Sequence, residues 1–89
     1  MQPGRDLDAA IAKKLGWSVI DGRWYPHYST NDGTALGLLE EIGLMFHGYP
    51  QNHGWRIYLY RDDMVYQAVH ETLPGAIALA CARALGVEE

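Results

Sequence analysis

The chain of 89 residues is predicted to form a single domain, residues 1–89, with a thin core, because a chain of this size buries only about 60–65% of its unfolded surface. Its composition, 48% hydrophobic and 20% charged, is typical of a globular protein and excludes a disordered one. The net charge of −4 argues against a general duplex-binding surface, and no apolar stretch approaches the roughly 20 residues of a membrane span.

The redox and targeting signals are few. A single cysteine, Cys81, can form no disulfide within the chain. The first residues, Met-Gln-Pro-Gly-Arg-Asp, run into a polar helix and lack the pattern of a secretory signal peptide. We therefore expect a cytoplasmic protein that gains stability by self-association, since its core is thin.

An amphipathic helix is predicted over residues 4–15. Leu7, Ile11 and Leu15 recur at a spacing of four, and Gly16 is typical of a helix end. Residues 17–20 and 23–25 then flank an Asp-Gly dipeptide, which favours a type I′ turn. The sequence therefore predicts a short hairpin after the first helix.

A second helix is predicted over residues 30–46, with Ser29 or Thr30 as its N-cap. Its apolar stripe, expected to cover a face of the sheet, consists of Ala35, Leu38, Leu39, Ile42, Met45 and Phe46. Gly33 and Gly37 lie on the other side of this helix. Two interpretations stay open: a merely weak helix, or a helix surface that another backbone approaches closely.

Residues 47–54 are predicted to form a loop, because they are rich in Gly, Pro and Asn. His47 and His53 lie six residues apart in this loop. No cysteine and no third ligand at a suitable spacing accompanies them, so we interpret them as solvated histidines and expect no metal site.

The segment that organises the sheet is a hairpin of residues 55–60 and 65–70, separated by Arg-Asp-Asp-Met. One predicted face carries Trp55, Ile57, Leu59, Val65 and Val69. The other carries Arg56, Tyr58, Tyr60, Tyr66 and His70. Since neither face is plainly hydrophilic, both are expected to be covered by helices, a second chain or a ligand.

A third helix is predicted to begin at Thr72 or Glu71, with Pro74 in its first turn, and to end at Gly86. Cys81 belongs to its apolar stripe and is interpreted as a core residue rather than a nucleophile. The predicted class is α+β.

No catalytic constellation is evident, so we expect no enzyme and no cofactor. The adjacent acids Asp62 and Asp63 fit a solvated turn, and neither common phosphate-binding glycine motif occurs. Aromatic residues in and around the strands are interleaved with basic ones. Aromatic rings can stack on bases, and basic side chains can bind phosphates. Core packing is the alternative role for these aromatic residues.

Four segments resemble the phage ABA-sandwich domain. They are Gly-Arg-Asp-Leu-Asp-Ala-Ala-Ile-Ala at 4–12, Leu-Gly-Trp at 15–17, Pro-His-Tyr-Ser-Thr-Asn at 26–31, and Ala-Ile-Ala-Leu-Ala-Cys-Ala-Arg-Ala-Leu at 76–85. The resemblance spans nearly the whole chain, and its motifs concern helix packing and capping. It implies a three-layer α/β/α sandwich, an antiparallel sheet with helices on both faces.

One branch of that family, the phage anti-Thoeris sponge, sequesters cyclic ADP-ribose isomers, and in some members cyclic di- and trinucleotides, without cleaving them, usually as an oligomer. The resemblance thus implies a homo-oligomer in the cytoplasm of the infected bacterium, with a cyclic nucleotide as ligand. The residues expected to bind it are Arg56, Arg61, Tyr58, Tyr60, Trp24 and His27. A small protein-interaction module is the alternative function, and the net charge disfavours single-stranded nucleic acid as a partner.

Overall fold

A computed structural model of the chain describes residues 2–16 and 26–87. In order, its elements are α1 (Arg5–Lys14), α2 (Asp32–Ile42), β1 (Met45–Gln51), β2 (Gly54–Arg61), β3 (Met64–His70) and α3 (Leu73–Leu85). The three strands form one antiparallel sheet in the order β1-β2-β3. The predicted hairpin of residues 17–25 lies outside the described residues.

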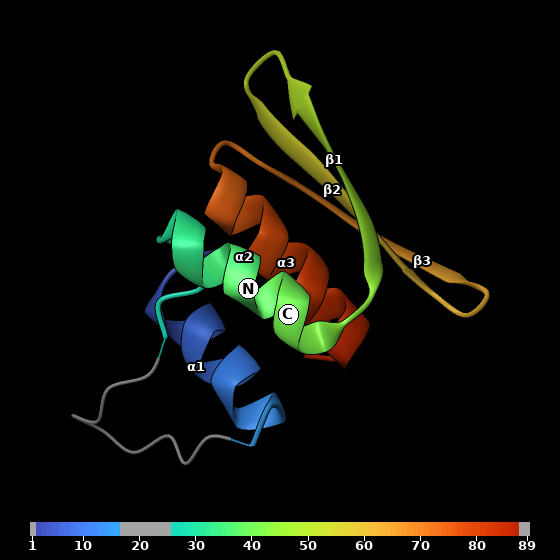
Figure 1. Cartoon of the computed structure of the whole chain (residues 1–89). Coiled ribbons are helices and arrows are strands. Elements are labelled where there is room, and N and C mark those ends of the chain that lie inside the picture. The colour runs from blue at the N-terminus through green and yellow to red at the C-terminus, as the bar shows by residue number, and fades with distance from the viewer. Residues whose placement is uncertain (1, 17–25, 88–89) are drawn as a thin grey trace.

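All three helices lie on one side of the sheet (Figure 1). α3 packs directly on β2 and β3, and α1 and α2 pack on the far side of α3. The α+β class is confirmed, but the expected sandwich with helices on both faces is not. The stripe of α2 covers α3 rather than the sheet, because α3 already occupies the sheet face.

α3 is the centre of the core. Every residue from Pro74 to Ala82 is buried, and seven of the thirteen residues of the helix are small (Gly, Ala or Cys). A helix that is apolar all round can be covered on all sides, and its small side chains let the neighbouring elements approach closely. The sheet contributes Ile57, Leu59 and Ala68 to this core.

The ends of α3 agree with the prediction. Thr72 is the N-cap, and its Oγ1 accepts a hydrogen bond from the Gly75 backbone N–H at 3.1 Å. Pro74 lies in the first turn, where its missing N–H breaks no helical hydrogen bond. Gly86 ends the helix in the left-handed conformation.

α2 differs from the prediction at both ends. Its N-cap is Asn31, whose Oδ1 accepts from the Thr34 backbone N–H at 2.9 Å, rather than Ser29 or Thr30. Its C-cap is Gly43, at a φ of 73° that side chains other than hydrogen disfavour. Met45 and Phe46 therefore begin a strand instead of continuing the helix.

β1 replaces the loop expected over residues 47–54. Gly48 fits because a methyl group in its place would lie 3.1 Å from Ile57 Cδ1, which leans across it. Pro50 fits because β1 is an edge strand, where a missing N–H leaves no ladder bond unmade.

Candidate functional site

The side of the sheet that faces away from α3 is the candidate site, and we call it the open face. The register pairs Tyr58 with His47 and Gln67, and Arg56 with Tyr49 and Val69. Directly paired residues of a sheet share a face, and residues two apart along a strand share it too. The open face therefore consists of Met45, His47, Tyr49, Arg56, Tyr58, Tyr60, Val65, Gln67 and Val69.

The side chains of β3 point to the opposite faces of the sheet from those predicted. Asp62 and Asp63 form a two-residue turn, with a positive φ of 53° at Asp62, so Arg61 pairs with Met64 and Leu59 with Tyr66. Tyr66 and His70 consequently share the covered side with Leu59. Val65 and Val69 lie on the open face, so the predicted division of this strand was wrong.

Four aromatic rings form a connected group on the open face. The ring of His47 meets Tyr60 edge to face at a centroid distance of 5.4 Å and Tyr49 at 6.2 Å, and Tyr49 meets Tyr58 at 5.8 Å. Edge-to-face pairs stabilise one another and hold the rings at fixed angles. The face thus offers a preorganised aromatic surface, with Tyr49 47% exposed at its outer strand.

Arg56 places a positive charge beside this group. One of its guanidinium N–H groups donates to Gln67 Oε1 at 2.8 Å, from the diagonal position on β3. A guanidinium carries five N–H donors in a planar fork, so this bond orients the group while using one donor. Such a fork can bind a phosphate or carboxylate in two-point contact.

The structure brings together three of the six predicted ligand residues: Arg56, Tyr58 and Tyr60. Arg61 lies on the covered side and donates to the Ala84 carbonyl at 3.0 Å, at the C-terminal end of α3. His27 is exposed and lies before α2, near Asp8. Trp24 lies outside the described residues.

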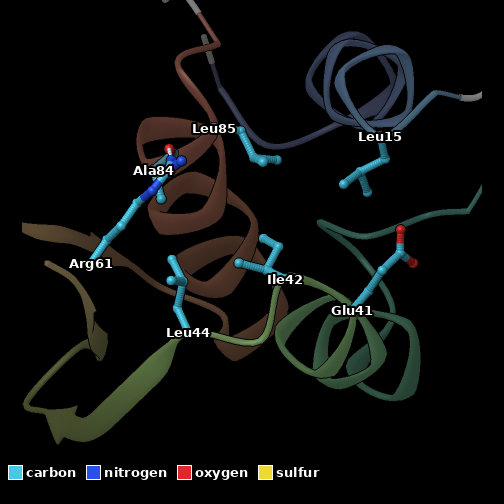
Figure 2. A pocket seen from close by; sticks show the side chains of 7 residues that line it. All are labelled: Leu15, Glu41, Ile42, Leu44, Arg61, Ala84 and Leu85. Atoms are coloured by element: carbon cyan, nitrogen blue, oxygen red, sulfur yellow. Dashed lines mark hydrogen bonds between the residues drawn. The ribbon is translucent and has the colours of Figure 1, made fainter.

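Arg61 belongs instead to a cavity of about 310 Å³ where the C-terminal ends of the helices meet (Figure 2). Its lining consists of Leu15, Glu41, Ile42, Leu44, Arg61, Ala84 and Leu85. In Figure 2 the aliphatic side chains point toward one another, with Glu41 and Arg61 at opposite sides. The helix C-termini and Glu41 make this end of the fold favourable for a cation rather than a phosphate.

A second cavity, of about 320 Å³, lies at the other end of the helices. It is lined by Gln2, Pro3, Ser29, Thr30, His70, Thr72 and Pro74. His70 Nδ1 accepts a hydrogen bond from the Thr72 backbone N–H at 3.2 Å and lies 3.1 Å from Thr72 Oγ1. These bonds support the N-cap of α3, so the polar groups of this cavity have a structural role.

Two residues important for this site were missed in the sequence. His47 and Tyr49 were assigned to a loop, and they supply half of the aromatic group. Gly43 is the signal that the sequence offers, because a glycine that ends the helix there leaves Met45 and Phe46 outside it.

Cys81 is a core residue. Burial raises the pKa of its thiol to about 12, so a thiolate nucleophile is disfavoured at neutral pH. Among residues 2–16 and 26–87, no three His, Cys, Asp or Glu side chains are grouped to hold a metal ion.

We expect Cys81 in the folded protein to be unreactive toward Ellman's reagent at about pH 8, because access and ionisation are both low. Unfolding in urea should release one thiol per chain. Cys81→Ala should lower stability modestly and leave ligand binding within a few-fold. Rapid labelling of the folded protein would contradict the buried position.

No protein-family model and no curated protein matches the sequence. Of the helices within the described residues, none has the length and apolarity needed to cross a membrane. The chain is similar to a solved structure, the 2.0 Å crystal structure of a phage protein from Bacillus cereus ATCC 14579, with a TM-score of 0.82 and 24% sequence identity. The match covers 100% of this chain and 92% of the other, so the two proteins share one fold over this extent.

Proposed function

We propose that this protein is a phage-encoded binding protein that sequesters a cyclic nucleotide immune signal, a cyclic ADP-ribose isomer or a cyclic di- or trinucleotide, without cleaving it. Its proposed place of action is the cytoplasm of the infected bacterium, where such signals are made. The observation that carries this proposal is the open face, on which the guanidinium of Arg56 lies beside the connected rings of His47, Tyr49, Tyr58 and Tyr60. The fold shared with a phage protein supports the phage origin.

The chemistry of the open face matches the chemistry of such a ligand. Bases stack on aromatic rings in a way that tolerates different bases, because every base has a π-face. The phosphate charge pairs with the guanidinium fork of Arg56. The −4 net charge of the chain makes a local cation important for an anionic ligand.

The binding energy required points to more than one chain. Sequestration at nanomolar affinity needs about −12 kcal/mol. One stacked base supplies about 1–3 kcal/mol and one charge-assisted hydrogen bond about 1.5–3 kcal/mol. Since Arg56 is the one arginine that the three described strands place on the open face, the proposed site combines the open faces of a homo-oligomer.

The decisive experiment compares two arginines on opposite sides of β2. By calorimetry with a cyclic ADP-ribose isomer or a cyclic dinucleotide, Arg56→Gln should weaken binding by about tenfold or more. Arg61→Gln should leave the dissociation constant within about twofold and lower stability by about 1 kcal/mol, because it removes the contact to Ala84.

The chemistry is tested on the ligand itself. Mass spectrometry of the supernatant after heat denaturation should recover the nucleotide intact. A cleaved product would make the protein an enzyme and overturn the proposal. Uptake of no such nucleotide, or equal loss of affinity in both arginine variants, would also count against it.

A small protein-interaction module is the second candidate, and the apolar part of the open face favours it. Met45, Val65 and Val69 are large exposed hydrophobic residues on this face. Met45 and Val65 flank Tyr60 on the two outer strands, and large apolar side chains exposed on one face are suited to a protein contact. Under this alternative, Val65→Lys would abolish capture of a phage or host partner, and the arginine variants would have no nucleotide phenotype.

A further inference from the structure

β1 is the least protected element of the described fold. All seven of its residues are exposed, including Met45 at 70% and Phe46 at 45%. α3 packs on β2 and β3 but not on β1, so no helix of the described residues covers either side of this strand. An exposed apolar edge strand is a template for pairing with another strand.

The register shows which backbone groups of β1 point outward. Because Arg61 and Met64 close a two-residue hairpin, alternate residues of β2, among them Leu59 and Ile57, exchange hydrogen bonds with β3. The residues between them bond to β1. Phe46 and Gly48, the partners of Leu59 and Ile57, therefore turn their N–H and C=O groups toward the free edge.

The opposite edge of the sheet is protected. By the same alternation, Gln67 of β3 turns its backbone groups outward. The guanidinium of Arg83, from α3, donates to the Gln67 carbonyl. A cationic side chain on an outward carbonyl blocks strand pairing at the middle of β3. Within residues 2–16 and 26–87 the two edges thus differ, and only the β1 edge presents an uncovered run of backbone groups.

We infer that β1 pairs antiparallel with β1 of a second copy of this chain, across a twofold axis near His47 and Gly48, to form a continuous sheet of six strands, three from each chain. In a twofold pair, β1 of one copy runs antiparallel to β1 of the other, so the strand must be compatible with its own reversed sequence. β1 reads Met-Phe-His-Gly-Tyr-Pro-Gln and contains no Asp, Glu, Lys or Arg. Its self-pairing therefore meets none of the like-charge repulsion that protects natural edge strands.

The side chains of β1 also suit a second copy. Outward N–H and C=O groups at Phe46 and Gly48 on each chain can exchange four hydrogen bonds across the axis when 46 lies opposite 48 of the other chain. The exposed Phe46 ring then lies beside a glycine, which leaves room for it, and Met45 lies opposite Tyr49. Large side chains thus meet small or flexible ones.

This dimer rests on the proposed function, in which the open faces of a homo-oligomer combine. It adds that β1 is the interface between the two chains. An axis perpendicular to the sheet keeps both open faces on the same side. The aromatic groups around His47 and Tyr49 of the two chains then adjoin, with one Arg56 from each chain flanking them. The resulting surface has the two cations that the affinity requires.

The association is tested without any nucleotide, by sedimentation equilibrium. Wild-type protein should be a dimer at about 100 µM. Phe46→Lys, which places charge on the edge, should be monomeric while retaining the wild-type circular dichroism spectrum. The matched control Val69→Lys, on the protected edge strand, should remain dimeric. A monomeric wild type, or a dimeric Phe46→Lys protein, would overturn the inference.

Cysteine cross-linking gives a second test that does not depend on Phe46. His47→Cys should form a disulfide dimer under mild oxidation, because the two strands cross at this residue and facing strand residues have Cα separations that a disulfide can bridge. Val69→Cys should remain unlinked, and Cys81 does not interfere because it is buried. Equal cross-linking of both variants would contradict the β1 interface. A dimer that binds no nucleotide would refute the proposed function alone.

Discussion

Replacing Leu59 with alanine is expected to lower the free energy of unfolding by about 2.5–5 kcal/mol, by the combined loss of buried surface and creation of a cavity. Leu59 is 0% exposed and lies in the central strand β2, paired with Phe46 on β1 and with Tyr66 on β3. A domain of this size has a total stability of roughly 5–10 kcal/mol. The urea midpoint of Leu59→Ala should therefore fall well below that of the wild type.

Val65→Ala is the matched control, since Val65 lies in the adjacent strand and is 53% exposed on the open face. It should change the free energy of unfolding by less than about 0.5 kcal/mol. The sequence pattern placed Leu59 and Val65 on the same face, so this pair of variants tests the register directly. A similar cost for both substitutions would contradict the pairing of Leu59 with Tyr66.

The ends of α3 could be predicted because their determinants are local. Thr72, Pro74 and Gly86 each act on the backbone within a few residues, and each has the predicted role. α1 was predicted within one residue at each end for the same reason. Local capping chemistry is independent of how the helices pack.

The orientation of β3 could not be predicted from apolarity, because valine and tyrosine both suit a covered position. The turn decides it. Two residues, Asp62 and Asp63, connect the strands, and a loop longer by one residue would have reversed every side chain of β3. Turn length is thus the stronger constraint on this hairpin.

The end of α2 was missed because the spacing of Met45 and Phe46 continues the helical stripe by coincidence. Gly43 ends the helix by adopting a left-handed conformation, and the strand then gains hydrogen bonds from β2 that no local pattern reveals. The prediction of the candidate site was incomplete for the same reason. Arg56, Tyr58 and Tyr60 follow from alternation within one strand, whereas His47 and Tyr49 depend on long-range pairing.

Asp8→Ala is expected to destabilise the protein by about 1–3 kcal/mol, because it leaves a buried donor without an acceptor. Asp8 is 1% exposed, and its Oδ1 accepts a hydrogen bond from the Ser29 backbone N–H at 2.8 Å. Ser29 Oγ in turn accepts from the Gly4 backbone N–H at 2.8 Å. These bonds attach the segment before α2 to the start of α1, a connection across more than twenty residues.

Asp8→Asn is the informative partner variant, because it keeps an oxygen for the Ser29 N–H and removes the ionisable group. It should retain most of the stability that Asp8→Ala loses, as measured by urea unfolding at about pH 7. Equal destabilisation by the two substitutions would show that the hydrogen bond to Ser29 contributes little to stability.

The ionisation of Asp8 should give the stability a distinct pH dependence. Burial raises the pKa of this carboxyl above its ordinary value of 3.8, although hydrogen bonds from Ser29 and the charge of His27 act in the opposite direction. A folded state that binds the proton more tightly than the unfolded chain is favoured at low pH. This contribution is fully present below about pH 3.8 and is lost as the pH rises through the folded-state pKa. The difference in unfolding free energy between wild type and Asp8→Asn should thus fall as the pH is raised from about 3.5 to about 7. Other carboxylates titrate equally in both proteins, so this difference in unfolding free energy isolates the contribution of Asp8. A difference that increases with pH would show that the folded protein favours the ionised carboxylate.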